Sequence, residues 1–193
     1  MSRGPNEEEI VDKIRKHTIN LGHEDRDVRK NAVNELHRIG VHAVPLLRDA
    51  LKDVNLARDK IRFHNIVLAL KKIGAKYSGN KEILQGLYSD LTNALGNGNR
   101  VVQNNAGEEL VKIGVPAIPV LIDGLEGEIK IIDVPGGRLK DSFSNRKQRA
   151  KNKIMFNNIV VALQRIGRAN QGNKKVLDTI RSALNKYGLR LKL

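Results

Sequence analysis

The sequence predicts an all-α protein, an α-solenoid of about four short helical hairpins that follow one another along the chain. Two observations predict this class. Residues 99–125 carry two apolar stripes at helical spacing, separated by a glycine and a turn that contains a proline. Looser copies of the same pattern recur along the rest of the chain. Because a hairpin of this size cannot bury its apolar stripe alone, the copies are expected to stack on one another.

The hairpin at 99–125 is the clearest unit. Gly114 is predicted to end its first helix, because glycine accepts the left-handed conformation of a C-terminal cap. Pro119 falls in the first turn of the second helix, where the missing N–H costs little. The residues expected to be buried are Val102, Ala106, Leu110 and Ile113 in the first helix and Ile118, Leu121, Ile122 and Leu125 in the second.

An N-terminal helix over residues 5–21 is expected to cap the open end of the stack. Asn6 can be its N-cap, and the three glutamates that follow suit the positive end of a helix dipole. A first pair of hairpins is then predicted over residues 25–95. Its first helix begins after Asp25 or Asp27 and ends at Gly40.

The repeats indicate a tandem duplication, with two hairpins in each half. A shift of 74 residues places the first hairpin on the third, with Ile-Gly on Ile-Gly and proline on proline. A shift of 93 residues places residues 60–74 on 153–167, with many identities. The second pair of hairpins is therefore predicted over residues 99–188, and we expect residues 1–193 to form a single domain.

An insertion separates the third hairpin from the fourth. The two shifts differ by nineteen residues, and the extra residues lie in the segment 126–150. Within it, IKIIDVPGGRLK has the β-branched residues and the Pro-Gly-Gly turn of a short β-ribbon. A basic loop fits nearly as well, and the sequence leaves both open.

The hairpins resemble HEAT-like repeats, of the short type also found in phycobilin-lyase-like proteins. The resemblance depends on the Ile-Gly that closes the first helix of each hairpin and is best over IGVPAIPVLIDGL at 113–125. It covers roughly residues 25–188. It implies a right-handed α-solenoid with a concave surface that serves as a scaffold for proteins or nucleic acids, and it implies no particular activity.

Four asparagines stand in register, each eight residues before the isoleucine of an Ile-Gly pair: Asn31, Asn65, Asn105 and Asn158. Asparagine is unfavourable inside helices, so four in register call for a cause. One hypothesis is a ladder of hydrogen bonds that fixes the register of stacked helices. The other is a row of polar groups along a groove that contacts a ligand.

Positive charge accumulates toward the C-terminus. The formal net charge is +14, and residues 126–193 hold 16 Lys and Arg against 5 Asp and Glu. Within this part, the basic run at residues 138–153 contains a single carboxylate, Asp141. Its positive charges therefore repel one another unless phosphates or another polyanion contact them. The alternative is the solvated start of a helix. The candidate nucleic-acid-binding residues are Arg138, Lys140, Arg146, Lys147, Arg149, Lys151 and Lys153.

Composition argues against several other functions. The absence of cysteine excludes disulfides and thiolate metal sites, and three Phe, three Tyr and no Trp argue against stacking on bases. The five histidines are scattered and form no HExxH-like pair, so no metal, cofactor or catalytic residue is predicted. No apolar run approaches the ~18 residues of a membrane span, and the start MSRGPNEEE is unlike a signal peptide. We therefore expect a cytoplasmic protein without membrane contact.

These observations lead to one leading hypothesis and one alternative. The leading hypothesis is a monomeric, non-catalytic module that binds nucleic acid, RNA slightly ahead of DNA, or a ribonucleoprotein, mainly through phosphates. The alternative is a HEAT-repeat protein–protein adaptor that is basic because its partner is an acidic protein.

Overall fold

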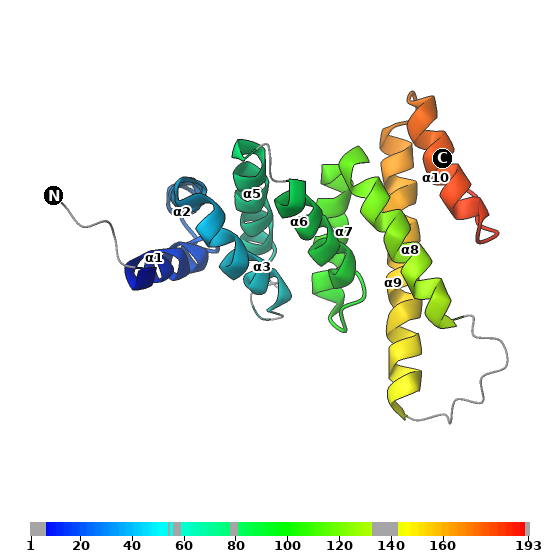
Figure 1. The fold of residues 1–193 in the computed structure, drawn as a ribbon, viewed down its shortest axis with the longest axis horizontal. Helices are drawn as coiled ribbons and strands as arrows, with labels where there is room; N and C mark the ends of the chain where they lie inside the picture. Colours follow the sequence, from blue (N-terminus) through cyan, green and yellow to red (C-terminus); the bar gives the residue numbers. More distant parts are fainter. Residues whose placement is uncertain (1–6, 54, 56–58, 78–80, 133–142, 192–193) are drawn as a thin grey trace. The chain divides into compact units, whose positions relative to one another are not determined.

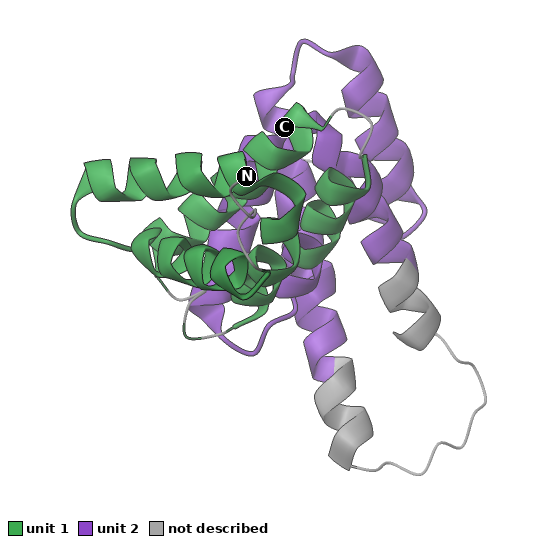
Figure 2. Cartoon of the chain, turned by 60° about the vertical axis from the view of Figure 1, so that its left-hand side comes forward, with its two compact units in different colours: residues 1–90 green, residues 91–193 purple. Residues whose placement is uncertain are grey.

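The computed structural model describes all residues except 1–6, 54, 56–58, 78–80, 133–142 and 192–193, and of 127–132 and 143–149 it describes the backbone alone. The described residues contain helices and turns and no strand. This confirms the all-α prediction. Contacts divide the chain into two compact units, residues 1–90 and 91–193, and the division falls within one helix, α6 (Lys81–Ala94) (Figure 2).

The described residues of the first unit form four further helices. Their bounds are α1 (Glu7–Asn20), α2 (Arg26–Ile39), α3 (Val44–Lys52) and α5 (Lys60–Lys76), with a 3-10 turn η1 (Gly40–Ala43) between α2 and α3 (Figure 1). Helix α2 packs against α1 and α5, and α3 packs against α1 and α5. The apolar faces of these helices meet in a core whose largest fully buried side chains include Ile14, Leu36, Leu47, Phe63 and Ile66.

The second unit is built around its longest helix. It contains α7 (Arg100–Ile113), η2 (Val115–Ala117), α8 (Ile118–Ile132), α9 (Phe143–Ala169) and α10 (Lys174–Asn185). Helices α7, α8 and α10 each pack against α9, which is drawn in yellow and orange in Figure 1. The core includes Leu110, Leu121, Ile159, Leu163 and Ile180, all of which are fully buried.

Short polar side chains cap the N-termini of several helices. Asp25 caps α2 by accepting hydrogen bonds from the backbone N–H groups of Asp27 (2.7 Å) and Val28 (3.5 Å), so the first of the two predicted candidates is the cap. Asp59 caps α5 in the same way, and Asn99 and Asn173 cap α7 and α10. Asn6 lies outside the described residues.

The predicted insertion is helical wherever it is described. Residues 129–132, the first part of the expected β-ribbon, continue α8, and residues 143–150 form the first turns of α9. The ribbon prediction is therefore wrong for residues 129–132. The β-branched side chains of this short apolar run fit a helix as well as a strand, because a run of four has no period of its own. The remainder of the expected turn, 133–142, lies outside the described residues.

Two glycines end α2 and α7 with a backbone that other residues rarely adopt. Gly40 has φ 75° and ψ −136°, and Gly114 has φ 72° and ψ −133°. The positive φ agrees with the sequence prediction, whereas ψ differs from the left-handed helical value. Both glycines still donate their N–H to the last turn of the helix, to Leu36 O and Leu110 O.

We expect Gly114→Ala to destabilise the protein by about 1–3 kcal/mol, since alanine is strained at this φ and ψ. Gly40→Ala should cost more, because its Cβ would also overlap the Tyr77 hydroxyl. Gly98→Ala is the control, since Gly98 has open space around it and no positive φ. Urea unfolding followed by circular dichroism measures all three. Equal losses for Gly98→Ala and Gly114→Ala would contradict this interpretation.

His17 makes the stability of the first unit sensitive to pH. Burial lowers the pKa of His17, partly offset by Glu35 on α2, while Lys16 and Arg38 lower the pKa further. Its Nδ1 is buried and has no hydrogen-bond partner within the described part of the chain. A folded-state pKa below the unfolded value means that the unfolded chain binds the proton more readily.

The contribution of His17 to stability should therefore be complete above about pH 6.5 and should decline as the pH falls below that value. His17→Gln removes the titration. We expect the urea midpoint of the wild-type protein to fall more steeply than that of His17→Gln between neutral and mildly acidic pH. The control is His64→Gln, because His64 is exposed. Parallel pH profiles for wild type and His17→Gln would contradict the assignment.

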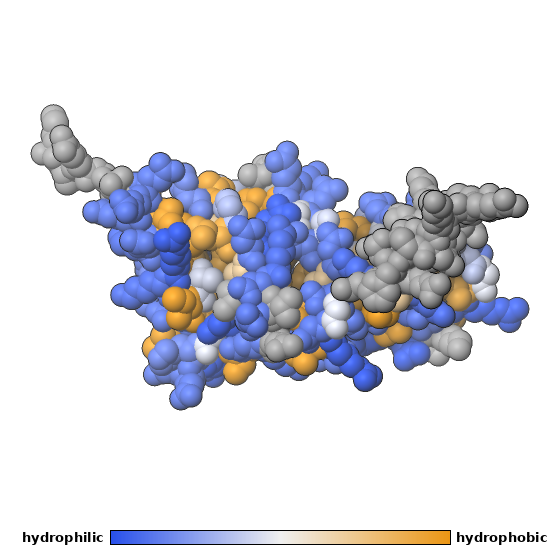
Figure 3. Space-filling view, turned by 90° about the horizontal axis from the view of Figure 1, so that it is seen from below, coloured by the Kyte–Doolittle hydropathy of each residue, from blue (hydrophilic) through white to orange (hydrophobic). Residues whose placement is uncertain are grey.

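Side chains on the described surface are mainly polar. Blue, hydrophilic residues cover most of the face drawn in Figure 3, with orange apolar residues between them. The exposed large apolar side chains include Ile19, Ile61, Val101, Ile154 and Val161, which come from four different helices. None of the described helices has both the length and the apolar character needed to cross a membrane.

Candidate functional site

The structure describes only part of the predicted basic run at residues 138–153. Arg138 and Lys140 lie outside the described residues. Arg146, Lys147 and Arg149 lie in the first turns of α9, where the backbone alone is described. Further along the same helix, the side chains of Lys151 and Lys153 are exposed. The helix begins ten residues before the segment that the repeat predicts, so five of the seven candidate residues belong to α9.

Cations continue through the rest of the second unit. Residues 143–193 hold thirteen Lys and Arg and a single carboxylate, Asp178. Nine of these cations have described side chains, and all nine are exposed: Lys151, Lys153, Arg165, Arg168, Lys174, Lys175, Arg181, Lys186 and Arg190. Asp178 pairs with Arg181 at 2.8 Å, and Glu126 of α8 pairs with Lys186 at 3.0 Å. These two carboxylates neutralise only a small part of the charge.

The structure does not gather all of these cations at one place. Lys151 and Lys153 lie in the first half of α9, whereas Arg168 lies in its last turn, and Lys174 and Lys175 begin α10. At 1.5 Å per residue, the seventeen residues from Lys151 to Arg168 correspond to about 26 Å along the helix axis. The described cations of α9 therefore do not form one compact cluster.

The four asparagines in register have different surroundings. Asn65 Nδ2 donates to Leu21 O at 2.8 Å, just beyond the end of α1. Asn158 Nδ2 donates to Leu95 O at 2.8 Å, just beyond the end of α6, and to Gln103 Oε1 at 3.3 Å. The two acceptors, Leu21 and Leu95, are themselves 74 residues apart, which is the shift of the repeat.

The other two asparagines are Asn31, which is exposed, and Asn105, which is 5% exposed. A helix end leaves backbone carbonyls without intrahelical partners, and a side-chain amide can satisfy one of them. The hydrogen bonds of Asn65 and Asn158 therefore tie α5 to the end of α1 and α9 to the end of α6.

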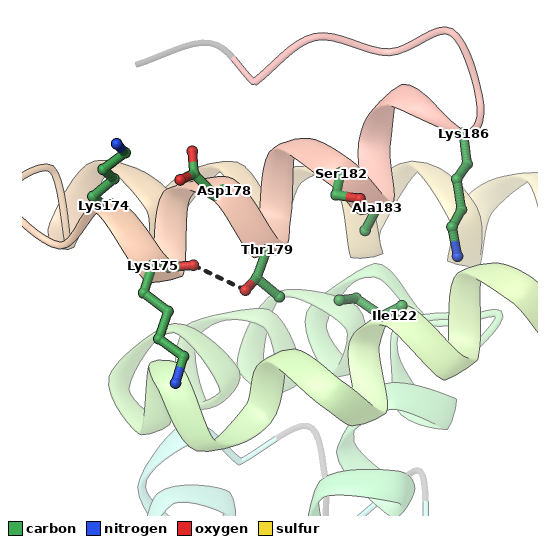
Figure 4. A pocket seen from close by; sticks show the side chains of 8 residues that line it. All are labelled: Ile122, Lys174, Lys175, Asp178, Thr179, Ser182, Ala183 and Lys186. Carbon is green, nitrogen blue, oxygen red and sulfur yellow. Dashed lines mark hydrogen bonds between the residues drawn. The ribbon is translucent and has the colours of Figure 1, made fainter.

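A groove between α8 and α10 lies in the second unit. Its volume is about 830 Å³, and the residues that line it include Ile122, Lys175, Thr179, Ala183 and Lys186 (Figure 4). In Figure 4, Ile122 projects from α8 toward α10, while Lys175 and Lys186 extend from opposite ends of α10 toward α8. Sequence reasoning did not predict this groove, because Ile122 was expected in the core.

No group of three or more His, Asp or Glu side chains that could hold a metal ion occurs among the residues described. His23 serves the local fold, since its Nδ1 accepts a hydrogen bond from the Asp25 N–H at 3.0 Å.

No protein-family model matches the sequence, and comparisons with curated proteins and with solved structures also find no match.

Proposed function

We propose that the protein is a non-catalytic HEAT-like repeat module, with its hairpins stacked as an α-solenoid, that binds nucleic acid or a ribonucleoprotein through a basic surface. The observation that carries this proposal is the charge of residues 143–193, thirteen cations against one carboxylate. Like charges at this density repel one another, and a polyanion removes that repulsion while releasing its counterions.

The nature of the cations indicates what they contact. All nine cations described in this part of the chain are exposed side chains on helices or in the C-terminal segment. Exposed Lys and Arg mainly contact phosphates, which position a nucleic acid without reading its sequence. With three Phe, three Tyr and no Trp in the whole chain, base stacking contributes little. The proposed mode of binding is therefore electrostatic, with weak sequence preference.

Salt titration of binding tests the proposal. The probes are a structured RNA and a duplex DNA, each measured by fluorescence anisotropy between about 50 and 200 mM salt. We expect micromolar or tighter binding near physiological salt. With about six phosphate contacts, log K should fall with log salt with a slope of about −5 on duplex DNA. No binding of either probe at the lowest salt, or binding that does not depend on salt, would overturn the proposal.

A further inference from the structure

The two halves of the chain differ at one structurally equivalent place. In the first unit, Arg48 of α3 and Asp90 of α6 form an ion pair in which Arg48 Nη2 donates to Asp90 Oδ1 at 3.1 Å and Nε donates to the other oxygen. Asp90 is 9% exposed. The shifts of 74 and 93 residues place Ile122 on Arg48 and Ala183 on Asp90. The second unit therefore has no ion pair at this place.

A second difference accompanies the first. A Cβ added to Gly86 of α6 would lie 3.0 Å from Arg48 Nη1, so the guanidinium fills the space beside this glycine. The equivalent residue in α10 is Thr179. The hollow of the first unit that has Arg48 in its wall measures about 250 Å³, and its other lining residues correspond to residues that line a hollow of about 310 Å³ in the second unit. In the second unit, Thr179, Ile122 and Ala183 line the groove of about 830 Å³.

A neighbouring hollow extends this groove toward the start of α8. It measures about 310 Å³, its lining includes Val115, Pro119 and Val176, and it shares Lys175 and Thr179 with the groove. Helices α8 and α10 each pack on α9, and the hollow space between them is lined largely by aliphatic atoms. The second unit thus places the aliphatic side chains of Ile122 and Ala183 in a groove where the first unit has the ion pair of Arg48 and Asp90.

The charge at the groove also changes sign. Glu82 of the first unit becomes Lys175 in the second, and Lys174 stands beside it at the start of α10. Neither lysine forms an ion pair with a carboxylate of the described chain. At the other end of the groove, Lys186 pairs with Glu126 across to α8. The lining of the groove therefore combines the aliphatic side chains of Ile122 and Ala183 with three lysines, Lys174, Lys175 and Lys186, and one carboxylate, Asp178 (Figure 4).

We propose that the groove between α8 and α10 binds an acidic amphipathic helix of a protein partner. A groove between two helices can bind the apolar face of a third helix, whose side chains at positions i, i+3 or i+4, and i+7 enter the groove. Ile122, Ala183 and the Thr179 methyl group supply the apolar contact, and Lys174 and Lys175 select for carboxylates. Nucleic acid suits this site less well, because its floor is aliphatic and the described lining has no aromatic side chain on which a base could stack.

The test uses a displayed library of helical peptides selected on the full chain. The peptides share a leucine stripe at i, i+3 and i+7, and their flanking positions are randomised among Glu, Gln and Lys. We expect the enriched peptides to be acidic. Each should lose roughly tenfold or more in affinity on Ile122→Arg/Ala183→Asp, which introduces into the second unit the ion pair of the first.

Two further variants keep the outcome decisive. Lys174→Glu/Lys175→Glu leaves the packing intact and should weaken the acidic peptides by a similar factor, whereas the control Lys13→Glu/Lys16→Glu, with the same change in net charge on exposed α1 residues, should not. If the ion-pair variant loses its helical circular dichroism, the lysine variants decide.

The proposal is overturned if no peptide is enriched, if enrichment shows no acidic bias, or if the enriched peptides bind the groove variants as tightly as the wild-type chain. It is also overturned if Ile122→Arg/Ala183→Asp abolishes RNA binding and leaves peptide binding intact, since the groove would then belong to the nucleic-acid site.

Discussion

Reversing Arg146, Lys147, Arg149 and Lys151 to glutamate is expected to weaken RNA and DNA binding by about a hundredfold or more. Each lysine or arginine that contacts a phosphate contributes about one unit to the slope of log K against log salt, so the variant should also show a slope that is flatter by about four. The four residues belong to the first turns of α9, whose backbone is helical from Phe143. Glutamate is as good a helix former as lysine, so the helix should persist.

The control for this variant makes the same change in net charge on other helices, α1 and α2. Lys13, Lys16, Arg26 and Lys30 are exposed on α1 and α2, and reversing all four also lowers the net charge by eight. If binding depends on a local cluster, this control keeps most of its affinity and the α9 variant does not. Anisotropy titrations at one fixed salt concentration compare the two, and circular dichroism checks their helicity. Equal losses would mean that net charge alone attracts the nucleic acid, and the assignment to α9 would be wrong.

The sequence predicted helix ends better than it predicted the start of α9. The Ile-Gly pairs located the ends of α2 and α7, where the glycine has a positive φ. The same prediction is wrong for α5 and α9, which continue past Gly74 and Gly167 to Lys76 and Ala169. The first turns of α9, FSNRKQRA, carry no apolar stripe, so the repeat alone predicted the helix only from residue 153. The basic residues before it were left open between a polyanion contact and the solvated start of a helix. Their lysines, arginines and glutamine are good helix formers, and propensity rather than periodicity would have indicated the helix there.

The candidate groove was hidden for a different reason. Ile122 fits the apolar stripe of its helix, and a stripe does not tell whether a neighbouring helix covers each of its members. The useful signal was the comparison of the two halves, in which the pair Arg48 and Asp90 becomes Ile122 and Ala183. That difference between the halves can be interpreted only once the structure shows that Arg48 and Asp90 form an ion pair. A repeat thus supplies its own reference, but only once the contacts of one copy are known.

Comparison of the two halves also predicts that truncating two equivalent phenylalanines, Phe63 and Phe156, lowers the stability of the protein by very different amounts. Phe63 of α5 is 1% exposed, whereas Phe156 of α9, 93 residues later, is only half-buried. Phe63→Ala should cost about 3–5 kcal/mol, because it removes buried apolar surface and leaves a cavity in a core that relaxes only in part. Phe156 meets the Tyr187 ring edge-on, with centroids 6.1 Å apart. Its truncation should cost less than half as much, since solvent already reaches the ring and the aromatic pair adds only about 0.5–1.5 kcal/mol.

Urea unfolding of the two alanine variants, followed by circular dichroism, measures this difference, and hydrogen exchange of α2 and α5 locates it in the first unit. Phe63→Leu is the matched control, because it keeps an apolar side chain and should recover part of the loss. If Phe156→Ala is as damaging as Phe63→Ala, Phe156 carries more of the second unit's stability than its partial exposure implies. The two halves would then depend equally on this position, whatever the difference in burial.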